Sequence, residues 1–186
     1  AALDIGAEVT LISSASGLPA PAGAQVVAVE TAQEMADAVL HAVAEADALV
    51  MAAAVADFRP AQVAAQKLKK DEGPPVMTLE RNPDILLEVA KQRAASGRPQ
   101  VVAGFAAETE NLLENAQAKL ARKGLSLIVA NDVSAAGAGF AVDTNRVTLL
   151  SDDGSVDTLP LMSKAEVAEQ VMARVAARLV GQPGNG

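Results

Sequence analysis

The sequence contains no cysteine, no tryptophan and no tyrosine, and phenylalanine occurs only three times in 186 residues. Without cysteine there is no disulfide framework, and no basic segment followed by an apolar run opens the chain, so secretion is not indicated. With so few aromatic rings, a bound nucleobase would have to be held by backbone groups, apolar contacts and lysine. These features fit a cytoplasmic setting best.

Long apolar runs and an excess of basic residues are also missing. Asp, Glu, Lys or Gly interrupts every apolar run before it reaches about 18 residues, which argues against a membrane span. The formal net charge of −8 repels the phosphates of nucleic acid, and no stripe of Lys and Arg offsets it. We therefore expect a soluble protein that binds neither membranes nor nucleic acid.

The sequence does contain enough apolar residues, 51%, to fill one core. Strand-length apolar runs alternate with amphipathic stretches of helix length, which is typical of βα units that form a parallel sheet. The expected strands are 8–12, 25–29, 48–53, 100–106 and 125–130, and the expected helices are 31–45, 83–95, 108–123 and 163–180. The predicted fold is α/β, a Rossmann-like doubly wound and mainly parallel sheet. We expect one domain over 1–181 and a flexible tail over 182–186.

Two further structures are expected around this sheet. Residues 145–151 and 156–161 alternate apolar with polar around Asp152-Asp153-Gly154, which predicts a β-hairpin before the last helix. The alternating Lys67-Leu68-Lys69-Lys70, followed by a turn and the strand-like residues 76–79, predicts an extruded two-stranded flap. Three cations within four residues suit a triphosphate, although such a run is also typical of a solvated surface.

The beginning of the chain is unusual for this fold. Residues 1–12 read as the end of a first helix followed by the second strand of a doubly wound sheet, so a first strand and its glycine-rich turn are expected to be missing. No GxGxxG or Walker sequence is present in a suitable context. We expect the 186 residues to be part of a longer protein.

Polar segments follow several of the predicted strands, where open α/β sheets place their ligands. Asp57 follows residues 48–53 and could ligate Mg²⁺, and Arg59 could neutralise a phosphate. Asn82 as an N-cap, with Pro83 at the first helical position, would leave backbone N–H groups for an anion. Further candidates after strands or on the following helix are Phe58, Phe105, Lys119, Lys123, Asn131 and Asp132.

Each of these candidates also has a purely structural interpretation. Asp57 and Asn82 could simply cap turns, Phe105 could fill the core, and Lys119 and Lys123 could be surface lysines four residues apart on one helix face. His41, the only histidine, lies in the middle of a predicted helix, and no zinc set or Ser-His-Asp arrangement can be assembled. The convergence of several polar segments on one sheet edge is therefore the stronger argument for a site.

The strings AAAVADFRP, KLKK, NPDI, GFAAET, KLARKG and IVANDVS occur in this order between residues 52 and 134. Together they resemble the phosphopantothenoylcysteine synthetase family, the ligase half of a bifunctional bacterial enzyme of coenzyme A synthesis. The resemblance implies a dimeric cytoplasmic domain that uses CTP and Mg²⁺ to convert 4'-phosphopantothenate to an acyl-cytidylate. Cysteine then displaces CMP to give 4'-phosphopantothenoylcysteine. It also implies fusion to a flavin-dependent decarboxylase domain, with no flavin in the ligase domain itself.

The resemblance assigns roles to individual residues. It implies that Lys67 is the flap lysine important for catalysis and that Asp57 lies at the metal and nucleotide. The other residues that it places at the nucleotide are Met51, Ala52, Ala53, Asn82, Pro83, Asp84, Ile85, Phe105, Lys119 and Lys123. The family's amino-terminal Asn-x-Ser-Ser-Gly loop, which holds phosphate and the acyl intermediate, has no counterpart here. If this segment is truly deleted from the protein, we expect nucleotide to bind weakly and ligation to fail.

Other functions remain open from the residues alone. One alternative is a non-catalytic nucleotide-binding or regulatory α/β domain, and another is a structural interaction module. An NAD-dependent enzyme of the short-chain type is weakened by the missing glycine-rich turn and by the absence of any Tyr for a Tyr-x-x-x-Lys pair. The choice of CTP over ATP rests on the family alone.

Overall fold

The structure is a computed structural model, and it describes residues 1–15, 17–62, 76–108, 111–132 and 142–181. Within these ranges no helix is long and apolar enough to cross a membrane. The helices are η1 (Leu3–Ile5, a 3-10 helix), α1 (Ala32–Ala42), α2 (Ile85–Ser96), α3 (Leu112–Arg122) and α4 (Lys164–Gly181). The strands are β1 (Thr10–Ser13), β2 (Gln25–Ala28), β3 (Ala48–Met51), β4 (Phe58–Pro60), β5 (Leu79–Arg81), β6 (Val101–Glu108), β7 (Leu127–Asp132), β8 (Thr144–Asn145), β9 (Val147–Ser151), β10 (Val156–Thr158) and β11 (Met162–Ser163).

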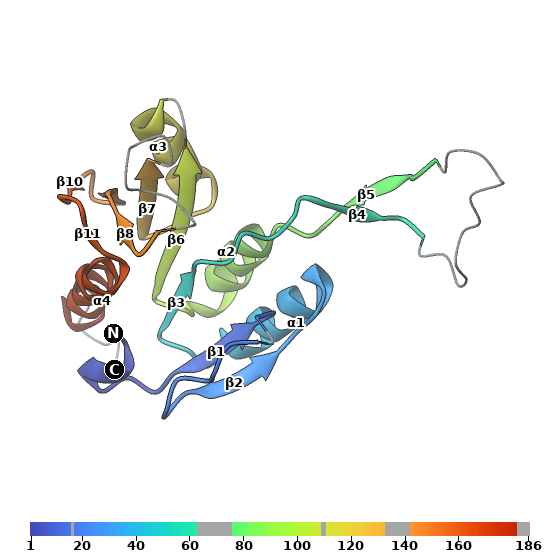
Figure 1. Cartoon of the computed structure of the whole chain (residues 1–186), viewed down its shortest axis with the longest axis horizontal. Coiled ribbons are helices and arrows are strands. Elements are labelled where there is room, and N and C mark those ends of the chain that lie inside the picture. Colours follow the sequence, from blue (N-terminus) through green and yellow to red (C-terminus); the bar gives the residue numbers. More distant parts are fainter. Residues whose placement is uncertain (16, 63–75, 109–110, 133–141, 182–186) are drawn as a thin grey trace.

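A five-stranded sheet in the order β10-β9-β7-β6-β3 forms the centre of the molecule (Figure 1). Strands β3, β6 and β7 are parallel, whereas β9 and β10 form an antiparallel hairpin at one edge. Gly154 in the hairpin turn has a φ of 84°, a conformation that glycine adopts without strain. The mainly parallel α/β sheet and the C-terminal hairpin with its helix are therefore confirmed.

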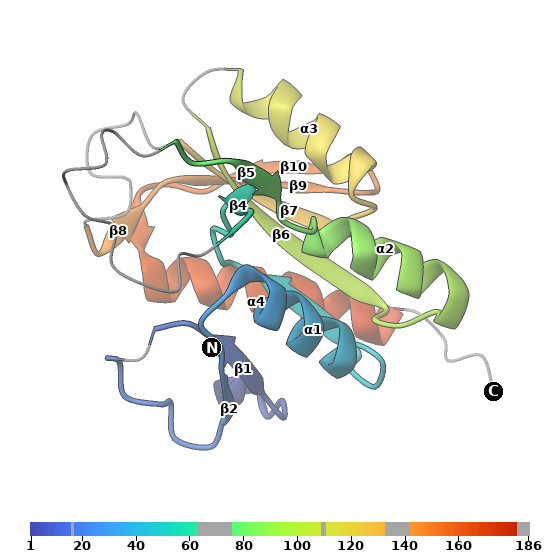
Figure 2. The same cartoon turned by 90° about the vertical axis from the view of Figure 1, so that its right-hand side faces the viewer.

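Helices cover both faces of this sheet, as a doubly wound fold requires. Val102 and Ala106 of β6 belong to a core shared with α1, α2 and α3, whereas Val101 and Ala103 belong to a second core shared with α4. This alternation follows the two-residue period of a strand. Figure 2 shows α2 and α3 on one side of β6 and α4 on the other.

The described strands do not form one continuous sheet. Strands β1 and β2 form a separate parallel pair that is not joined to β3. In the general doubly wound order 3-2-1-4-5-6, the strands in the second and fourth places lie on either side of the first and do not pair with each other. Strands β1 and β3 correspond to those two places. Helix α1 bridges the two parts, because its Met35 and Val39 belong to a core against which side chains of both β1 and β3 pack.

Two helices begin with the predicted capping boxes. The Thr31 hydroxyl accepts from the Glu34 N–H at 3.1 Å, and the Glu34 carboxylate accepts from the Thr31 N–H at 3.2 Å. Ser163 and Glu166 make the same reciprocal pair at the start of α4, at 3.2 Å and 2.8 Å. The starts of α1 and α4 are thus confirmed, although α1 ends at Ala42 rather than at residue 45.

The predicted start of α2 is wrong. Asp84, not Asn82, is the N-cap, and its carboxylate accepts from the Leu87 N–H at 3.4 Å. Asn82 cannot cap the helix because its side chain bonds to two other groups, Ala56 and Arg59. Pro83 consequently precedes the helix, which begins at Ile85.

Two further boundaries differ from the expectation. Strand β6 continues to Glu108, two residues beyond the expected end at residue 106, and the next helix, α3, begins at Leu112 rather than at residue 108. The stem of the flap pairs β4 with β5, and Phe58 lies opposite Arg81, so the expected second arm at 76–79 begins later. Residues 67–70 and the tail 182–186 lie outside the described residues.

Candidate functional site

The carboxyl ends of three parallel strands meet at one edge of the central sheet. Strands β3, β6 and β7 run side by side in the same direction and end at Met51, Glu108 and Asp132. The β4–β5 stem projects away from the body of the molecule (Figure 1). The strands from which the predicted polar segments leave therefore share one edge, and the flap stem follows β3. Residues 109–110 and 133–141, after β6 and β7, lie outside the described residues, so the convergence of the segments themselves stays a prediction.

A cavity of about 600 Å³ opens beside the end of β3. This volume is typical of small-molecule sites. Its wall includes Met51, Ala52 and Ala53, three of the predicted nucleotide residues, and Asn82. Because alanine side chains are short, they let a ligand approach the backbone closely. Ala52 and Ala53 are exposed, so this part of the wall is accessible.

Asn82 and Arg59 form a hydrogen-bonded clamp at the base of the stem. The Asn82 side-chain amide donates to the Ala56 carbonyl at 2.8 Å and accepts from Arg59 Nη1 at 3.0 Å. The Asn82 backbone N–H donates to the Asp57 carbonyl at 2.9 Å. Arg59 also pairs with Glu80 at 2.7 Å, so its charge is matched within the stem. The clamp fixes the loop after β3, and sequence reasoning missed it because its members are 21 to 26 residues apart.

The start of α2 and the end of α3 supply a second group of predicted residues. Lys123 Nζ lies 3.2 Å from the Asp84 carboxylate, so the structure brings these two residues together. Lys119 is one turn earlier on α3 and is half-buried. The positive end of the α2 dipole and the Lys123 ammonium favour an anion here, and the Asp84 carboxylate opposes it. The Ile85 side chain is core, so only its backbone could contact a ligand.

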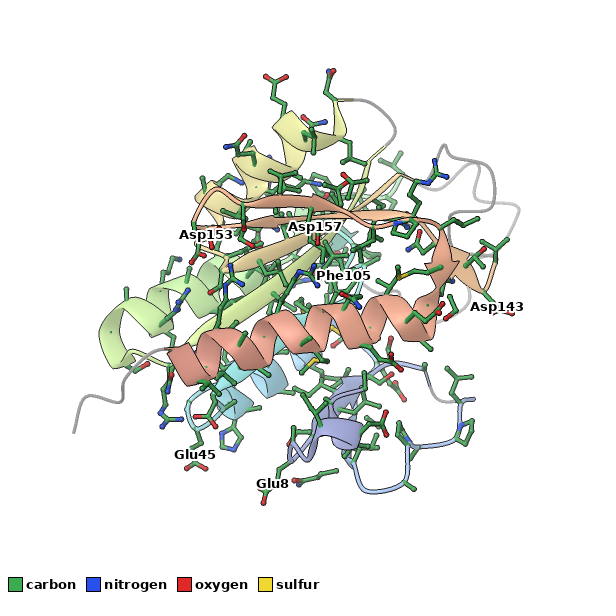
Figure 3. All side chains as sticks on the ribbon, turned by 90° about the vertical axis from the view of Figure 1, so that its left-hand side faces the viewer. Glu8, Glu45, Phe105, Asp143, Asp153 and Asp157 are labelled. Atoms are coloured by element: carbon green, nitrogen blue, oxygen red, sulfur yellow. The ribbon has the colours of Figure 1, made fainter. Side chains whose placement is uncertain are left out.

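Phe105 is on the opposite face of the sheet from these lysines. It pairs in register with Val129, which belongs to the core under α4, whereas α3 packs on the other face. Figure 3 looks from the α4 side and shows Phe105 near the strands behind that helix. The side chain is 40% exposed. The structure does not bring Phe105 to Lys119 and Lys123, and its nucleotide role stays a prediction.

Asn131, near the end of β7, has an unusual side chain. Its Oδ1 atom is buried, and within the described part of the chain it has no hydrogen-bond donor. A buried acceptor without a partner costs about 1–3 kcal/mol, so such atoms often mark a place for water or a ligand donor. Asp132 ends the same strand. Asn131 and Asp132 thus lie within β7 and not in the loop after it, and their role in a site stays a prediction.

The described residues do not build a complete metal site. No group of three or more His, Cys, Asp or Glu side chains in the described ranges could hold a metal ion. Mg²⁺ keeps several waters and often binds one or two carboxylates together with substrate phosphates. Asp57 is exposed at the loop after β3 and fits the role of one such shared ligand. Lys67 lies outside the described residues.

Phe58 and Arg81 make a contact across the flap stem. The Arg81 guanidinium carbon lies 5.8 Å from the centre of the Phe58 ring, within the range of a cation–π interaction. Phe58 is 50% exposed. This contact gives the candidate Phe58 a role in stabilising the stem. The sequence alone did not show that Phe58 in β4 lies opposite Arg81 in β5.

Comparisons with known proteins agree with this architecture. The "Coenzyme A biosynthesis bifunctional protein CoaBC" of Bacillus subtilis (strain 168) is 43% identical over 178 residues, covering 95% of this chain and 43% of that protein. The protein of the same name from Mycobacterium tuberculosis (strain H37Rv) is 47% identical over 184 residues, covering 95% and 44%. The chain thus spans less than half the length of these curated relatives.

Solved structures lead to the same family. The crystal structure of the C-terminal domain of a CoaBC protein matches with a TM-score of 0.79 and 38% identity, covering 97% of this chain and 81% of that one. The DNA/pantothenate metabolism flavoprotein from Streptococcus pneumoniae matches with a TM-score of 0.71 at 21% identity, and supports the fold alone. The sequence profile of one family spans residues 1–179. The chain belongs to the family described as the DNA/pantothenate metabolism flavoprotein C-terminal domain.

Proposed function

We propose that this domain takes part in coenzyme A biosynthesis as the CTP-dependent ligase that joins 4'-phosphopantothenate to cysteine. The observation that supports the proposal is the cavity beside the carboxyl end of β3, whose wall includes the exposed backbone at 51–53. Relatives named as coenzyme A biosynthesis proteins support the pathway. The sequence strings shared with the ligase family support the reaction.

The proposed chemistry has two steps. The carboxylate of 4'-phosphopantothenate attacks the α-phosphorus of CTP, and pyrophosphate leaves, giving an acyl-cytidylate. The cysteine amine then attacks the acyl carbon, loses a proton, and CMP leaves as the amide bond forms. Positioned cations stabilise charge that develops on the phosphates, which is the role proposed for Lys67, Lys119 and Lys123. A bound Mg²⁺ would add charge neutralisation at the triphosphate, with Asp57 as its protein ligand.

The wider assembly is also a proposal. We expect a cytoplasmic homodimer whose natural chain carries a flavin-dependent decarboxylase domain, with the flavin bound there and not in this domain. The word "bifunctional" in the names of the relatives, together with their greater length, supports a second activity outside the matched region.

The decisive test is pyrophosphate release. The chain, and a chimera that adds the unmatched parts of the solved CoaBC C-terminal domain, would be mixed with CTP, Mg²⁺ and 4'-phosphopantothenate. We expect the chimera to release pyrophosphate only when phosphopantothenate is present, and cysteine to convert the intermediate to 4'-phosphopantothenoylcysteine, detected by mass. Replacing CTP by ATP tests the nucleotide preference.

Matched lysine variants make the test specific. Lys67→Ala should abolish release, and Lys123→Ala should weaken CTP binding, since both remove a cation proposed to meet the triphosphate. Lys91→Ala is the control, because Lys91 is 72% exposed on α2 and, among the described residues, pairs with Glu88 in the same helix. If no nucleotide gives release but CTP still binds by calorimetry, the non-catalytic nucleotide-binding domain replaces the ligase.

A further inference from the structure

The Asp57 side chain has little around it to hold its direction. The residue is exposed in the loop after β3. Within the part of the chain that the structure describes, its carboxylate makes no hydrogen bond or ion pair. A ligand of Mg²⁺ must nevertheless point in a fixed direction, because this ion demands near-ideal octahedral geometry. Whatever fixes the direction of the Asp57 carboxylate must therefore act through the backbone.

The two peptide groups that flank the Cα atom of Asp57 are both bonded to Asn82. The Asn82 Nδ2 donates to the Ala56 carbonyl oxygen at 2.8 Å, and the Asn82 backbone N–H donates to the Asp57 carbonyl oxygen at 2.9 Å. Because peptide groups are planar, only two soft dihedral angles, φ and ψ, describe the backbone of a residue. Holding the peptide group on each side of Asp57 fixes both angles, and with them the direction of its Cα–Cβ bond.

The register of the flap stem explains why Asn82 lies opposite Asp57. Phe58 of β4 pairs with Arg81 of β5, so the next pair toward the body of the molecule is Asp57 and Asn82. The backbone bond between these two residues continues the β4–β5 ladder by one step. The orientation of the stem is thus passed directly to Asp57.

Arg59 and Glu80 determine which way the Asn82 amide faces. Turning an asparagine amide by 180° exchanges its oxygen and its NH₂ group, which are an acceptor and a donor. Arg59 can only donate, and its Nη1 lies 3.0 Å from Asn82 Oδ1, so the NH₂ group is left to face Ala56. Glu80 holds Arg59 in turn, because its carboxylate accepts from Arg59 Nε at 2.7 Å. Glu80 therefore completes the clamp.

We propose that Asn82 is a positioning residue, which directs the Asp57 carboxylate at the Mg²⁺ of the bound nucleotide. The inference deepens the proposed function and rests on it for the identity of the ligand. Asn82 acts through Asp57 and not by its own contact with the nucleotide. Arg59, whose charge Glu80 matches, serves the clamp and not a phosphate.

The backbone part of the proposal can be tested on the 186-residue chain without any nucleotide. The three-bond NMR coupling between the amide and Hα protons of Asp57 reports its φ angle. Asn82→Ala removes the bond to the Ala56 carbonyl, so this coupling should move toward a conformational average. Arg59→Lys should move it in the same direction, because lysine lacks the planar fork that reaches Glu80 and Asn82 together. An unchanged coupling in both variants would overturn the proposal.

Arg98 offers a matched control for Arg59. Its side chain is 42% exposed, compared with 39% for Arg59. Its Nη1 also reaches a carboxylate and a second oxygen, those of Asp47 at 2.9 Å and the Glu45 carbonyl at 3.0 Å. Arg98 precedes β6, at the end of that strand away from the candidate site. Arg98→Lys should leave both the Asp57 coupling and the binding of CTP unchanged.

Calorimetry on the chimera tests whether Asn82 acts through Asp57. Asp57→Asn removes the metal ligand, so it should weaken CTP binding in Mg²⁺ by about tenfold, without weakening the binding of CTP in the absence of metal. Asn82→Ala should do the same, because a misdirected carboxylate meets the metal poorly. The two losses should not add in the double variant, since both act on one contact. Additive losses, or equal weakening with and without Mg²⁺, would mean that Asn82 contacts the nucleotide itself and would overturn the proposal.

Glu80→Ala separates the clamp from a direct role of Arg59. If Arg59 were a phosphate ligand, loss of its carboxylate partner would free its charge, and CTP would bind more tightly. The clamp predicts weaker binding of CTP in Mg²⁺, because the Asn82 amide loses its orientation. Tighter or unchanged binding would contradict the clamp. If the unmodified chimera binds no CTP at all, the proposed function fails, and the coupling of Asp57 still decides whether the clamp sets its backbone.

Discussion

The central sheet and the β1–β2 pair are both largely parallel, yet their strands are buried to very different degrees. Every residue of β9 is buried, and the described core of β6 and β7 is almost fully enclosed. In β1 and β2 each residue is exposed or at most half-buried. Apolar strand sequences therefore become a core only when neighbours cover both edges and both faces.

This difference predicts unequal stability within one chain. The central sheet is packed between two helix layers, whereas the β1–β2 pair packs mainly on α1. Segments with few buried contacts open at lower free energy than the core. We expect β1 and β2 to exchange their amide hydrogens first and the central strands last.

Truncation of one leucine in each region should give the largest contrast. Leu127 in β7 is fully buried, so Leu127→Ala should lower the free energy of unfolding by about 2–5 kcal/mol through lost burial and a cavity. Leu11→Ala, at a side chain 36% exposed in β1, should cost well under half as much. Urea denaturation followed by circular dichroism measures both, and equal costs would show that the two regions are equally packed.

Close packing at Gly104 should give the next largest effect. A Cβ there would lie 2.9 Å from the Leu125 Cδ1 and 3.6 Å from Leu86, so Gly104→Ala forces Leu125 to move. Overpacking of this kind costs about 1–3 kcal/mol, toward the low end where one side chain can shift. Gly181→Ala is the control, since nothing lies within 4 Å of its added Cβ. A neutral Gly104→Ala in urea denaturation would mean that this part of the core is loosely packed.

Local signals in the sequence predicted much of this fold. The capping boxes at Thr31 and Ser163 and the Asp152-Asp153-Gly154 turn depend on residues within a few positions of each other, and all three are confirmed. The order of apolar runs likewise predicted the parallel strands and their common edge. These features could be read because their partners are close in the chain.

The features that were missed depend on residues far apart in the chain. Asn82 looks like an N-cap, but its amide bonds to Ala56 and Arg59, so Asp84 caps α2 instead. Phe105 lies on the face of β6 that α4 covers, and which helix covers each face depends on distant parts of the chain. For the site, the sequence predicted the edge but not the clamp that shapes it.

The two helix caps allow a smaller and more selective comparison. Removing an N-cap hydroxyl usually costs about 1 kcal/mol. Ser163→Ala weakens the start of α4, which packs on the central sheet, so it should lower the midpoint of global urea unfolding. Thr31→Ala weakens α1, so if α1 opens together with β1 and β2, it should mainly speed exchange of α1 amides. Equal shifts of the global midpoint by both variants would show that α1 unfolds with the central sheet.

The pH dependence of the same caps should give the smallest effect. Backbone N–H groups of Glu30 and Thr31 lower the pKa of Glu34 below its ordinary value of 4.5, and the Ser163 backbone N–H and then its hydroxyl lower the pKa of Glu166. When the pKa of a carboxylate is lower in the folded state than in the unfolded state, its charge stabilises the folded state at pH values above the ordinary pKa. This stabilisation is lost as the pH falls through the lowered pKa.

Thermal melts at pH 7 and at pH 3.5 or below should therefore reveal the contribution of each cap. Glu166→Gln removes the charge, so its Tm should be slightly below that of the unmodified chain at pH 7, and the difference should shrink in acid. Glu169→Gln, exposed on the same helix and outside the box, should show no such change. Because α1 joins the less buried region, Glu34→Gln should shift the Tm less than Glu166→Gln does. A larger shift for Glu34→Gln would mean that α1 limits the stability of the whole domain.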